Sequence, residues 1–267
     1  MIDVTSVSKT YETAKGGLVH ALQDVSLTIG RGEFVSIVGP SGCGKSTLLS
    51  IIAGLDEASH GAVGVAGVHV RRPSRDVSIV FQNPVLLPWR KVVDNVLLPI
   101  ELSSRRISQQ HRSKAGQVIE MVGLTGFENS YPRELSGGMQ QRCAIARALM
   151  LDAPVLLMDE PFGSLDALTR EQLNLEIQDI WMQTGTTVML ITHDIDEAVL
   201  LSDRVIVMSR RPGSIVRVFD IDAPRPRGHG VGDELETARV RAAIREELGV
   251  AGPVRSQQDV KEPTDVH

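Results

Sequence analysis

The spacing of apolar residues divides the chain into three stretches. In the first stretch, up to about residue 81, β-branched and alternating apolar residues predict short strands. One helix is predicted there, from Lys45 to Ala53, with Gly54 as its stop signal. The predicted strands of this stretch are 2–7, 18–29, 34–38, 61–66 and 77–81.

In the second stretch, about residues 84–150, the spacing becomes helical and no strand pattern interrupts it. Such a block between two strand-rich stretches predicts a helical subdomain inserted between strands of one main sheet. The predicted helices are 92–102, 108–122 and 138–151.

The third stretch alternates again between apolar runs of strand length and helical segments. Apolar runs of this kind are typical of buried parallel strands, so the sequence predicts an α/β sheet that binds its ligand at the carboxyl ends of the strands. The predicted order is strand 154–159, helix 167–184 ending at Gly185, strand 187–192, helix 194–201, and strands 204–209 and 214–219.

Beyond Ala223 the composition changes. Residues 224–232 are rich in Pro and Gly and predict a linker, and Glu234–Leu248 predicts a short amphipathic helix. We therefore divide the chain into a main domain at 1–222, an extension at 223–251 and a tail at 252–267 that is predicted to be disordered. The apolar face expected of the helix is Leu235, Ala238, Val240, Ala242 and Ile244.

Composition narrows the class of protein. The chain has 267 residues, 42% of them hydrophobic, which is enough for one large domain with a substantial core. A net charge of -5 argues against a dedicated nucleic-acid-binding protein. Its 2 cysteines, Cys43 and Cys143, are not placed for a disulfide and fit a reduced cytosol. No signal peptide or spanning segment is visible, so any membrane role is expected to come through a partner.

One motif for binding phosphate follows the strand 34–38. The pattern G-x-x-x-x-G-K-S places backbone N–H groups and a helix N-terminus around a phosphate. Lys45 is expected to neutralise the β- and γ-phosphates, and the Ser46 hydroxyl to bind Mg²⁺. The predicted nucleotide-binding residues here are Gly39, Pro40, Ser41, Gly42, Cys43, Gly44, Lys45, Ser46 and Thr47.

A second glycine-rich turn lies about ninety residues later, where Leu135–Arg142 reads Leu-Ser-Gly-Gly-Met-Gln-Gln-Arg. It opens a predicted helix, whose N-terminus carries about half a positive charge. The Ser136 hydroxyl and the N–H of Gly138 are therefore expected to bond phosphate oxygens. No arginine finger is evident near the phosphate loop, so this turn is expected to stabilise the charge on the γ-phosphate instead.

Polar residues follow three further strands. Asp159 and Glu160 end the strand 154–159, where Asp159 is expected near Mg²⁺ and Glu160 near the attacking water. Gln82 follows the strand 77–81, and His193 follows the strand 187–192. A single histidine at a strand end is more often structural, and that alternative stays open at this point.

These motifs, in this order over residues 2–220, resemble the ATP-binding-cassette (ABC) ATPases. The resemblance implies a P-loop fold with a mixed central sheet, an N-terminal antiparallel β-subdomain and an inserted helical subdomain. It implies that Gln82 contacts Mg²⁺ and water, that His193 contacts the γ-phosphate and that Tyr11 stacks on adenine. It also implies that Ser164–Asp166 crosses a dimer interface. For Tyr11 the alternative is packing on the β-subdomain, and for Asp166 a helix cap.

The same resemblance implies a head-to-tail dimer. The turn formed by Ser136, Gly137, Gly138 and Gln140 then closes on the nucleotide of a second copy, with ATP and Mg²⁺ held between the two.

A narrower resemblance concerns the importers of nitrate, sulfonates and taurine. It rests on the segments 81–96, 192–198 and 209–213, the first of which contains Leu-Leu-Pro-Trp before Arg90. It implies a peripheral subunit at the cytoplasmic face of the inner membrane, with permease subunits and, indirectly, a solute-binding protein as partners. Trp89 is expected to dock on the permease or, alternatively, to pack within the helical subdomain.

Two other functions remain open from the sequence. A soluble ABC ATPase acting on nucleic acid or the ribosome usually carries two cassettes or a long coiled coil, and neither is visible here. An ordinary P-loop kinase would have no use for the turn at Ser136 or for His193.

Overall fold

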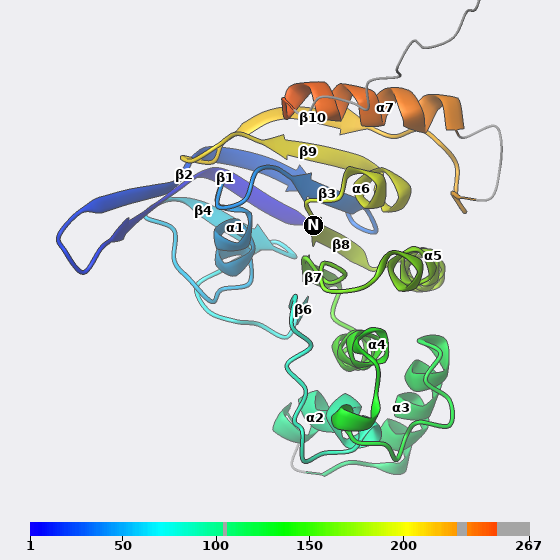
Figure 1. Cartoon of the computed structure of the whole chain (residues 1–267). Helices are drawn as coiled ribbons and strands as arrows, with labels where there is room; N and C mark the ends of the chain where they lie inside the picture. The colour runs from blue at the N-terminus through cyan, green and yellow to red at the C-terminus, as the bar shows by residue number, and fades with distance from the viewer. Residues whose placement is uncertain (104–105, 229–233, 250–267) are drawn as a thin grey trace, which may run out of the picture.

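The computed structural model describes residues 1–103, 106–228 and 234–249 and contains two sheets with helices around them (Figure 1). The smaller sheet is antiparallel and has the order β2-β1-β4-β5, which confirms the expected N-terminal β-subdomain. Its strand β1 runs five residues beyond its predicted end and carries Tyr11. The bounds are β1 (Ile2–Glu12), β2 (Leu18–Ile29), β4 (His60–Val65) and β5 (Val68–His69).

The larger sheet is mixed, as expected, and has the order β10-β9-β3-β8-β7-β6. Its strands from β9 to β6 are parallel, and only β10 runs antiparallel to its neighbour. The parallel strands are short and mostly buried, because helices cover one face and the small sheet, together with the helix at 45–52, covers the other. The bounds are β3 (Phe34–Val38), β6 (Val77–Val80), β7 (Val155–Asp159), β8 (Thr187–Ile191), β9 (Arg204–Met208) and β10 (Ile215–Asp220).

The helices follow the predicted spacing to within a few residues, and α5 has the predicted bounds. The helices α2, α3 and α4 gather at one end of the molecule, with β6 and β7 between them and α1 (Figure 1). The bounds are α1 (Lys45–Ile52), α2 (Val92–Ser103), α3 (Gln109–Met121), α4 (Gly137–Leu149), α5 (Ala167–Thr184) and α6 (Ile195–Leu201), with a 3-10 turn at Pro132–Glu134.

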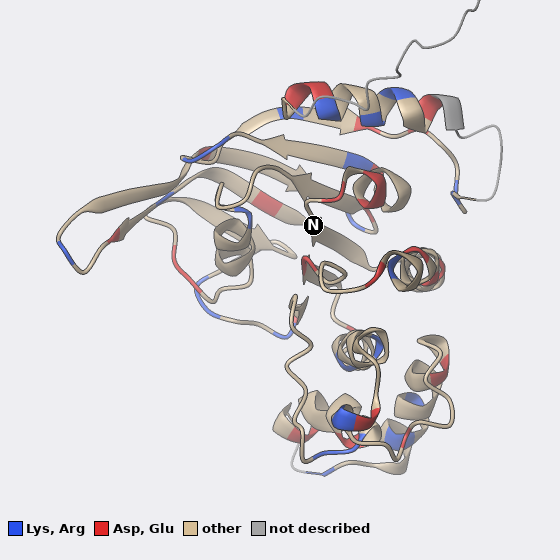
Figure 2. Ribbon diagram, in the orientation of Figure 1, with Lys and Arg blue, Asp and Glu red and all other residues tan. Residues whose placement is uncertain are grey.

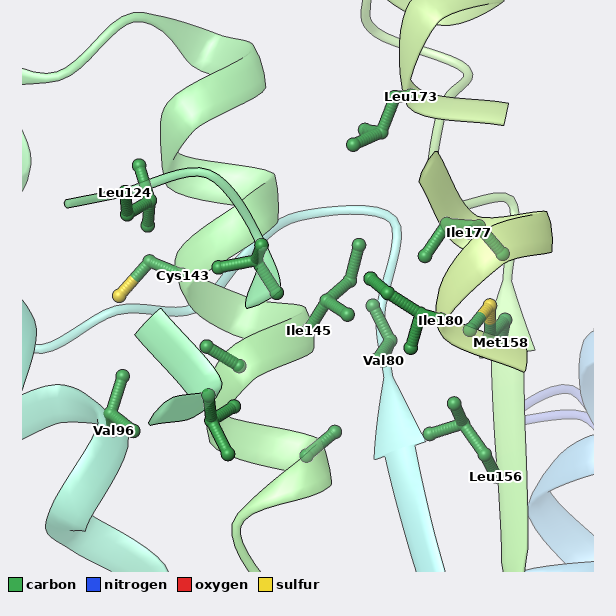
Figure 3. Packing of buried hydrophobic residues seen from close by; sticks show 14 of the residues in the cluster. Val80, Val96, Leu124, Cys143, Ile145, Leu156, Met158, Leu173, Ile177 and Ile180 are labelled. Carbon is green, nitrogen blue, oxygen red and sulfur yellow. The ribbon is translucent and has the colours of Figure 1, made fainter. Parts of the chain in front are cut away.

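One apolar cluster joins the helical end to the large sheet. Figure 3 shows Val96 and Leu124 on one side, Ile145 of α4 in the middle, and Met158 and Ile177 on the other. The residues in this cluster are buried, so α4 packs on the helical end and on the sheet together. Burial of this apolar surface contributes about 25 cal/mol per Å² and resists separation of the two parts.

The C-terminal extension packs on the main domain. Arg227 lies in the expected linker, yet it is buried and its guanidinium donates to backbone carbonyls that include those of Val199 and Ile221. The helix α7 (Glu234–Glu247) lies over α6 and β10. Ala238 and Ala242 of the predicted face are exposed, Val240 and Ile244 are not, and Leu235 is outside the side chains that the structure describes. The residues that face inward are Thr237, Val240, Ile244 and Leu248.

Charged residues are frequent on α7 and rare on the strands of the large sheet (Figure 2). Acidic residues lie at the two ends of α7 and basic residues between them. Because α7 exposes one side and buries the other, this pattern fits a helix held on the surface of the domain. The predicted tail at 252–267 lies outside the described residues.

Candidate nucleotide-binding and hydrolysis site

The order of the parallel strands brings the predicted site residues to one edge. Four neighbouring strands, β6, β7, β8 and β3, end at this edge. In that order, their carboxyl ends lead into Gln82, into Asp159 and Glu160, into His193, and into the phosphate loop. The loop follows β3, which pairs with both β8 and β9. Segments far apart in the sequence therefore meet at one edge of the sheet.

The phosphate loop has a backbone that only glycine fits at two positions. Gly42 and Gly44 have φ values of 73° and 106°, in the left-handed region. A Cβ on Gly44 would lie 2.7 Å from the carbonyl oxygen of Ala21, so the loop also packs closely on β2. Gly44 immediately precedes α1, whose first N–H groups point into the loop as an anion-binding surface.

Lys45 is buried and lies within the loop that it belongs to. Its Nζ donates to the carbonyl oxygens of Gly39 at 2.7 Å and Pro40 at 3.1 Å. A charged ammonium that is 5% exposed requires such partners. The side chain is thus held next to the place where phosphate oxygens would lie.

Two of the three residues predicted to hold Mg²⁺ are in direct contact. Ser46 Oγ donates to Asp159 Oδ1 at 3.1 Å, which joins the first turn of α1 to the end of β7. Burial raises the pKa of the Asp159 carboxyl, the hydrogen bond from Ser46 lowers it in part, and the nearby charge of Glu160 raises it further. A bound cation would favour the ionised form of this buried acid.

Glu160 and His193 also meet, across the ends of β7 and β8. His193 Nδ1 lies 3.2 Å from Glu160 Oε2. Glu160 has a φ of 45°, which non-glycine residues seldom adopt, and its N–H donates to Ile191 O at 2.8 Å. A Cβ on Gly163 would lie 3.5 Å from Gln82 Nε2 and 3.7 Å from Glu160 Oε2, so Gln82 approaches the same point.

The glycine turn at Ser136 packs elsewhere. Ser136 caps α4 by accepting from the N–H of Met139 at 3.3 Å. Gln140 donates to the carbonyls of Pro132 and Leu135, so it binds its own turn. A Cβ on Gly138 would lie 2.6 Å from Thr169, which places the turn against the start of α5. Among the described residues, no hydrogen bond connects this turn to the phosphate loop.

Asp166 and Tyr11 each have a structural partner. Asp166 caps α5, its Oδ1 accepting from Thr169 N at 3.0 Å, a bond that lowers the pKa of this carboxyl. Tyr11 is 39% exposed, and its hydroxyl donates to Asp56 at 2.7 Å. Burial raises the pKa of the Tyr11 hydroxyl, and the side chain of Thr47 opposes that shift, so Tyr11 lies beside the phosphate-loop helix.

Sequence reasoning missed the loop after β9. Arg211 Nε donates to the carbonyl oxygen of Gly42 at 3.1 Å, so this arginine contacts the backbone of the phosphate loop. A Cβ on Gly213 would lie 2.0 Å from the carbonyl oxygen of Cys43, so only glycine allows this close approach. The available signal was the motif Ser-Arg-Arg-Pro-Gly at a strand end next to β3.

A phosphate loop after β3, acids after β7 and a mixed sheet between helices define a P-loop ATPase domain. The family model described as ABC transporter matches residues 22–163. The chain belongs to the ABC transporter family and is an ATP-binding, ATP-hydrolysing cassette.

Two curated relatives are similar over most of their length. The aliphatic sulfonates import ATP-binding protein of Bacillus cereus is 45% identical over 226 residues, which are 85% of this chain and 88% of the relative. The nitrate import ATP-binding protein of Synechococcus elongatus is 44% identical over 223 residues, 83% of this chain and 81% of the relative.

Two solved structures agree with the fold. A bacterial ABC transporter cassette solved as a dimer is 36% identical, has a TM-score of 0.74, and covers 84% of this chain and 100% of its own. The same cassette in a post-hydrolysis state with ADP and Pi matches equally well. In the part of the chain that the structure describes, no helix is long and apolar enough to span a membrane.

Proposed function

We propose that this chain is the ATP-hydrolysing subunit of an importer for a small organic or inorganic anion of the nitrate, sulfonate or taurine type. It would act at the cytoplasmic face of the inner membrane, with separate permease subunits and, through them, a solute-binding protein. The support is the importer subunits among its relatives and the four strand ends that meet at one site. Both relatives are import proteins and give no support to an action on nucleic acid.

The chemistry is hydrolysis at the γ-phosphate. The loop Gly39–Thr47 binds the phosphates through backbone N–H groups, and Lys45 adds a positive charge. Glu160 orients and deprotonates the attacking water, and His193, 3.2 Å from it, holds Glu160 and the γ-phosphate in line. Gln82 lies within reach of the same water. Tyr11 stacks on the adenine.

The residues present fit Mg²⁺. This ion prefers oxygen ligands and is usually held by one or two carboxylates together with substrate phosphates. Ser46 and Asp159 supply a hydroxyl and a carboxylate that already touch, and Gln82 adds an amide oxygen from β6. When bound, the ion would neutralise charge that develops on the β- and γ-phosphates.

The site is completed by a second copy. The turn of Ser136, Gly137, Gly138 and Gln140 packs on α5 rather than on its own phosphate loop, so it is free to face another subunit's nucleotide. Asp166 starts α5 beside this turn and lies on the same surface. ATP then holds two chains together and hydrolysis releases them; turning a 1:99 equilibrium into 99:1 takes about 5.5 kcal/mol.

Mixing two inactive variants tests this arrangement. Glu160→Gln removes the proposed general base, and Ser136→Arg blocks the turn. If each site combines the phosphate loop of one chain with the turn of the other, a mixed dimer keeps one intact site. We expect an equal mixture to recover roughly a quarter of wild-type turnover, since half the dimers are mixed. No recovery, with ATP binding intact in both variants, would contradict the shared site.

The permease contact is tested at Trp89. This side chain is 71% exposed, which is contrary to packing within the helical end. The buried Asn95 holds the adjacent backbone by bonds to Leu87 and Arg90. We expect Trp89→Ala to keep the ATPase rate of the isolated chain and to lose stimulation by the permease in vesicles. Leu102→Ala, also exposed but on the far end of α2, is the matched control.

A further inference from the structure

One buried acid, Glu197, has no part in the proposed mechanism. Glu197 lies on α6, four residues after His193, and is only 5% exposed. Its Oε2 accepts from Thr192 Oγ1 at 3.1 Å, while its Oε1 is buried with no hydrogen-bond partner among the described residues. An ionised carboxylate in this position would be poorly compensated.

Hydrogen bonds around Glu197 enclose the segment that carries His193. The N–H of Asp194 donates to Thr192 Oγ1 at 3.0 Å, and that hydroxyl in turn donates to Glu197. The N–H of Glu197 donates back to Asp194 Oδ1 at 3.2 Å. His193 lies between Thr192 and Asp194, two of the three residues of this ring, at the carboxyl end of β8.

The charges around Glu197 oppose its ionisation. Asp194 on the same loop and Glu160 after β7 are both acids, and Arg170 of α5 is the one basic side chain among the described groups that acts on it. Arg170 is itself engaged by Asp194 at 3.3 Å and by the carbonyl of Leu165 at 2.9 Å. Burial, the largest cause, raises the pKa of Glu197 to about 8.

We propose that Glu197 is a positioning residue for hydrolysis: as the neutral acid, it holds the His193 segment through the Thr192 hydroxyl. Ionisation would place a negative charge next to Asp194 and Glu160 in a buried site. Burial and this repulsion together outweigh a stronger bond from the Thr192 hydroxyl, so ionisation would displace the His193 segment. The proposal rests on the proposed role of His193 and Glu160, and it adds a dependence of turnover on pH that those two residues do not explain by themselves.

The test compares turnover from pH 6.5 to pH 9.5 in wild type, Glu197→Gln and Glu197→Ala. Glutamine has the shape of the neutral acid but does not titrate. We expect Glu197→Gln to retain kcat within about twofold at pH 7, and to stay active where wild type declines, above about pH 8. We expect Glu197→Ala to lose about tenfold in kcat at pH 7 with little change in KM for ATP.

Two results would overturn the proposal: equal losses in the glutamine and alanine variants at pH 7, or the same alkaline decline in wild type and Glu197→Gln. If the alanine variant does not fold, the pH profiles of wild type and the glutamine variant still decide. If the Glu160→Gln and His193→Ala variants instead hydrolyse ATP at the wild-type rate, the proposed function itself is refuted. The failure of the proposal and the failure of the proposed function are therefore distinguishable.

Discussion

At the scale of single residues, the phosphate loop is held from outside as well as by its own glycines. Arg211 bonds the outward carbonyl of Gly42 and brings a positive charge to the loop. We expect Arg211→Ala to weaken ATP binding by about 1 kcal/mol, roughly fivefold in Kd. The neighbouring Arg210 is exposed and serves as the control, since Arg210→Ala should leave Kd unchanged. Equal Kd values for both variants, measured by nucleotide titration, would refute this role of Arg211.

Glu197 also gives a prediction for stability. Its pKa is about 8 in the folded chain against 4.5 for an unperturbed glutamate, so the folded state keeps a proton that the unfolded state loses. The free energy of unfolding contributed by Glu197 is therefore largest below pH 4.5, falls as pH rises to 8, and is constant above that. Denaturant titrations should show this fall in wild type and a smaller one in Glu197→Gln; parallel curves would contradict it.

At the scale of elements, the extension is held to the domain by Arg227. Its guanidinium donates to carbonyls at the end of α6 and after β10, and its backbone pairs with Gln178 of α5. Removing a buried arginine from such a network leaves its carbonyl partners unsatisfied. We expect Arg227→Met to lower the free energy of unfolding by about 3 kcal/mol.

The exposed Arg239 of α7 provides a control for that change, because Arg239→Ala should alter the free energy of unfolding by less than about 0.5 kcal/mol. Chemical denaturation of the two variants measures the difference. If Arg227→Met unfolds at the wild-type denaturant concentration, the extension is held by other contacts, such as that of Ile244.

The strands and helices were easier to predict from the sequence than the contacts between distant segments. Strands and helices of the main domain follow from apolar spacing, since each buries one face or both. The helix of the extension follows in the same way, but its packing on the domain does not, because the buried positions include Thr237 and Arg227, which a count of apolar residues does not find. The contact of Arg211 with Gly42 was also invisible, since it depends on β9 pairing with β3 over 169 residues of sequence. The phosphate loop and the acid pair could be predicted from motif spacing, because the residues of each are adjacent in the sequence.

At the scale of the whole molecule, a single chain contains all parts of the site but keeps them on two surfaces. The phosphate loop, Asp159, Glu160 and His193 lie together at the ends of the parallel strands. The turn at Ser136 lies with α5, joined to the sheet through the cluster that Figure 3 shows. With the phosphate loop and the Ser136 turn on separate surfaces, both can contact one nucleotide only if two chains close on it.

The most direct test measures the mass of Glu160→Gln in solution with ATP, because this variant should bind nucleotide without consuming it. The account predicts a particle of twice the 29.0 kDa chain with ATP, and a single chain with ADP or when Ser136→Arg is added. A variant that binds ATP and still remains a single chain at high concentration, with or without the permease, would contradict it.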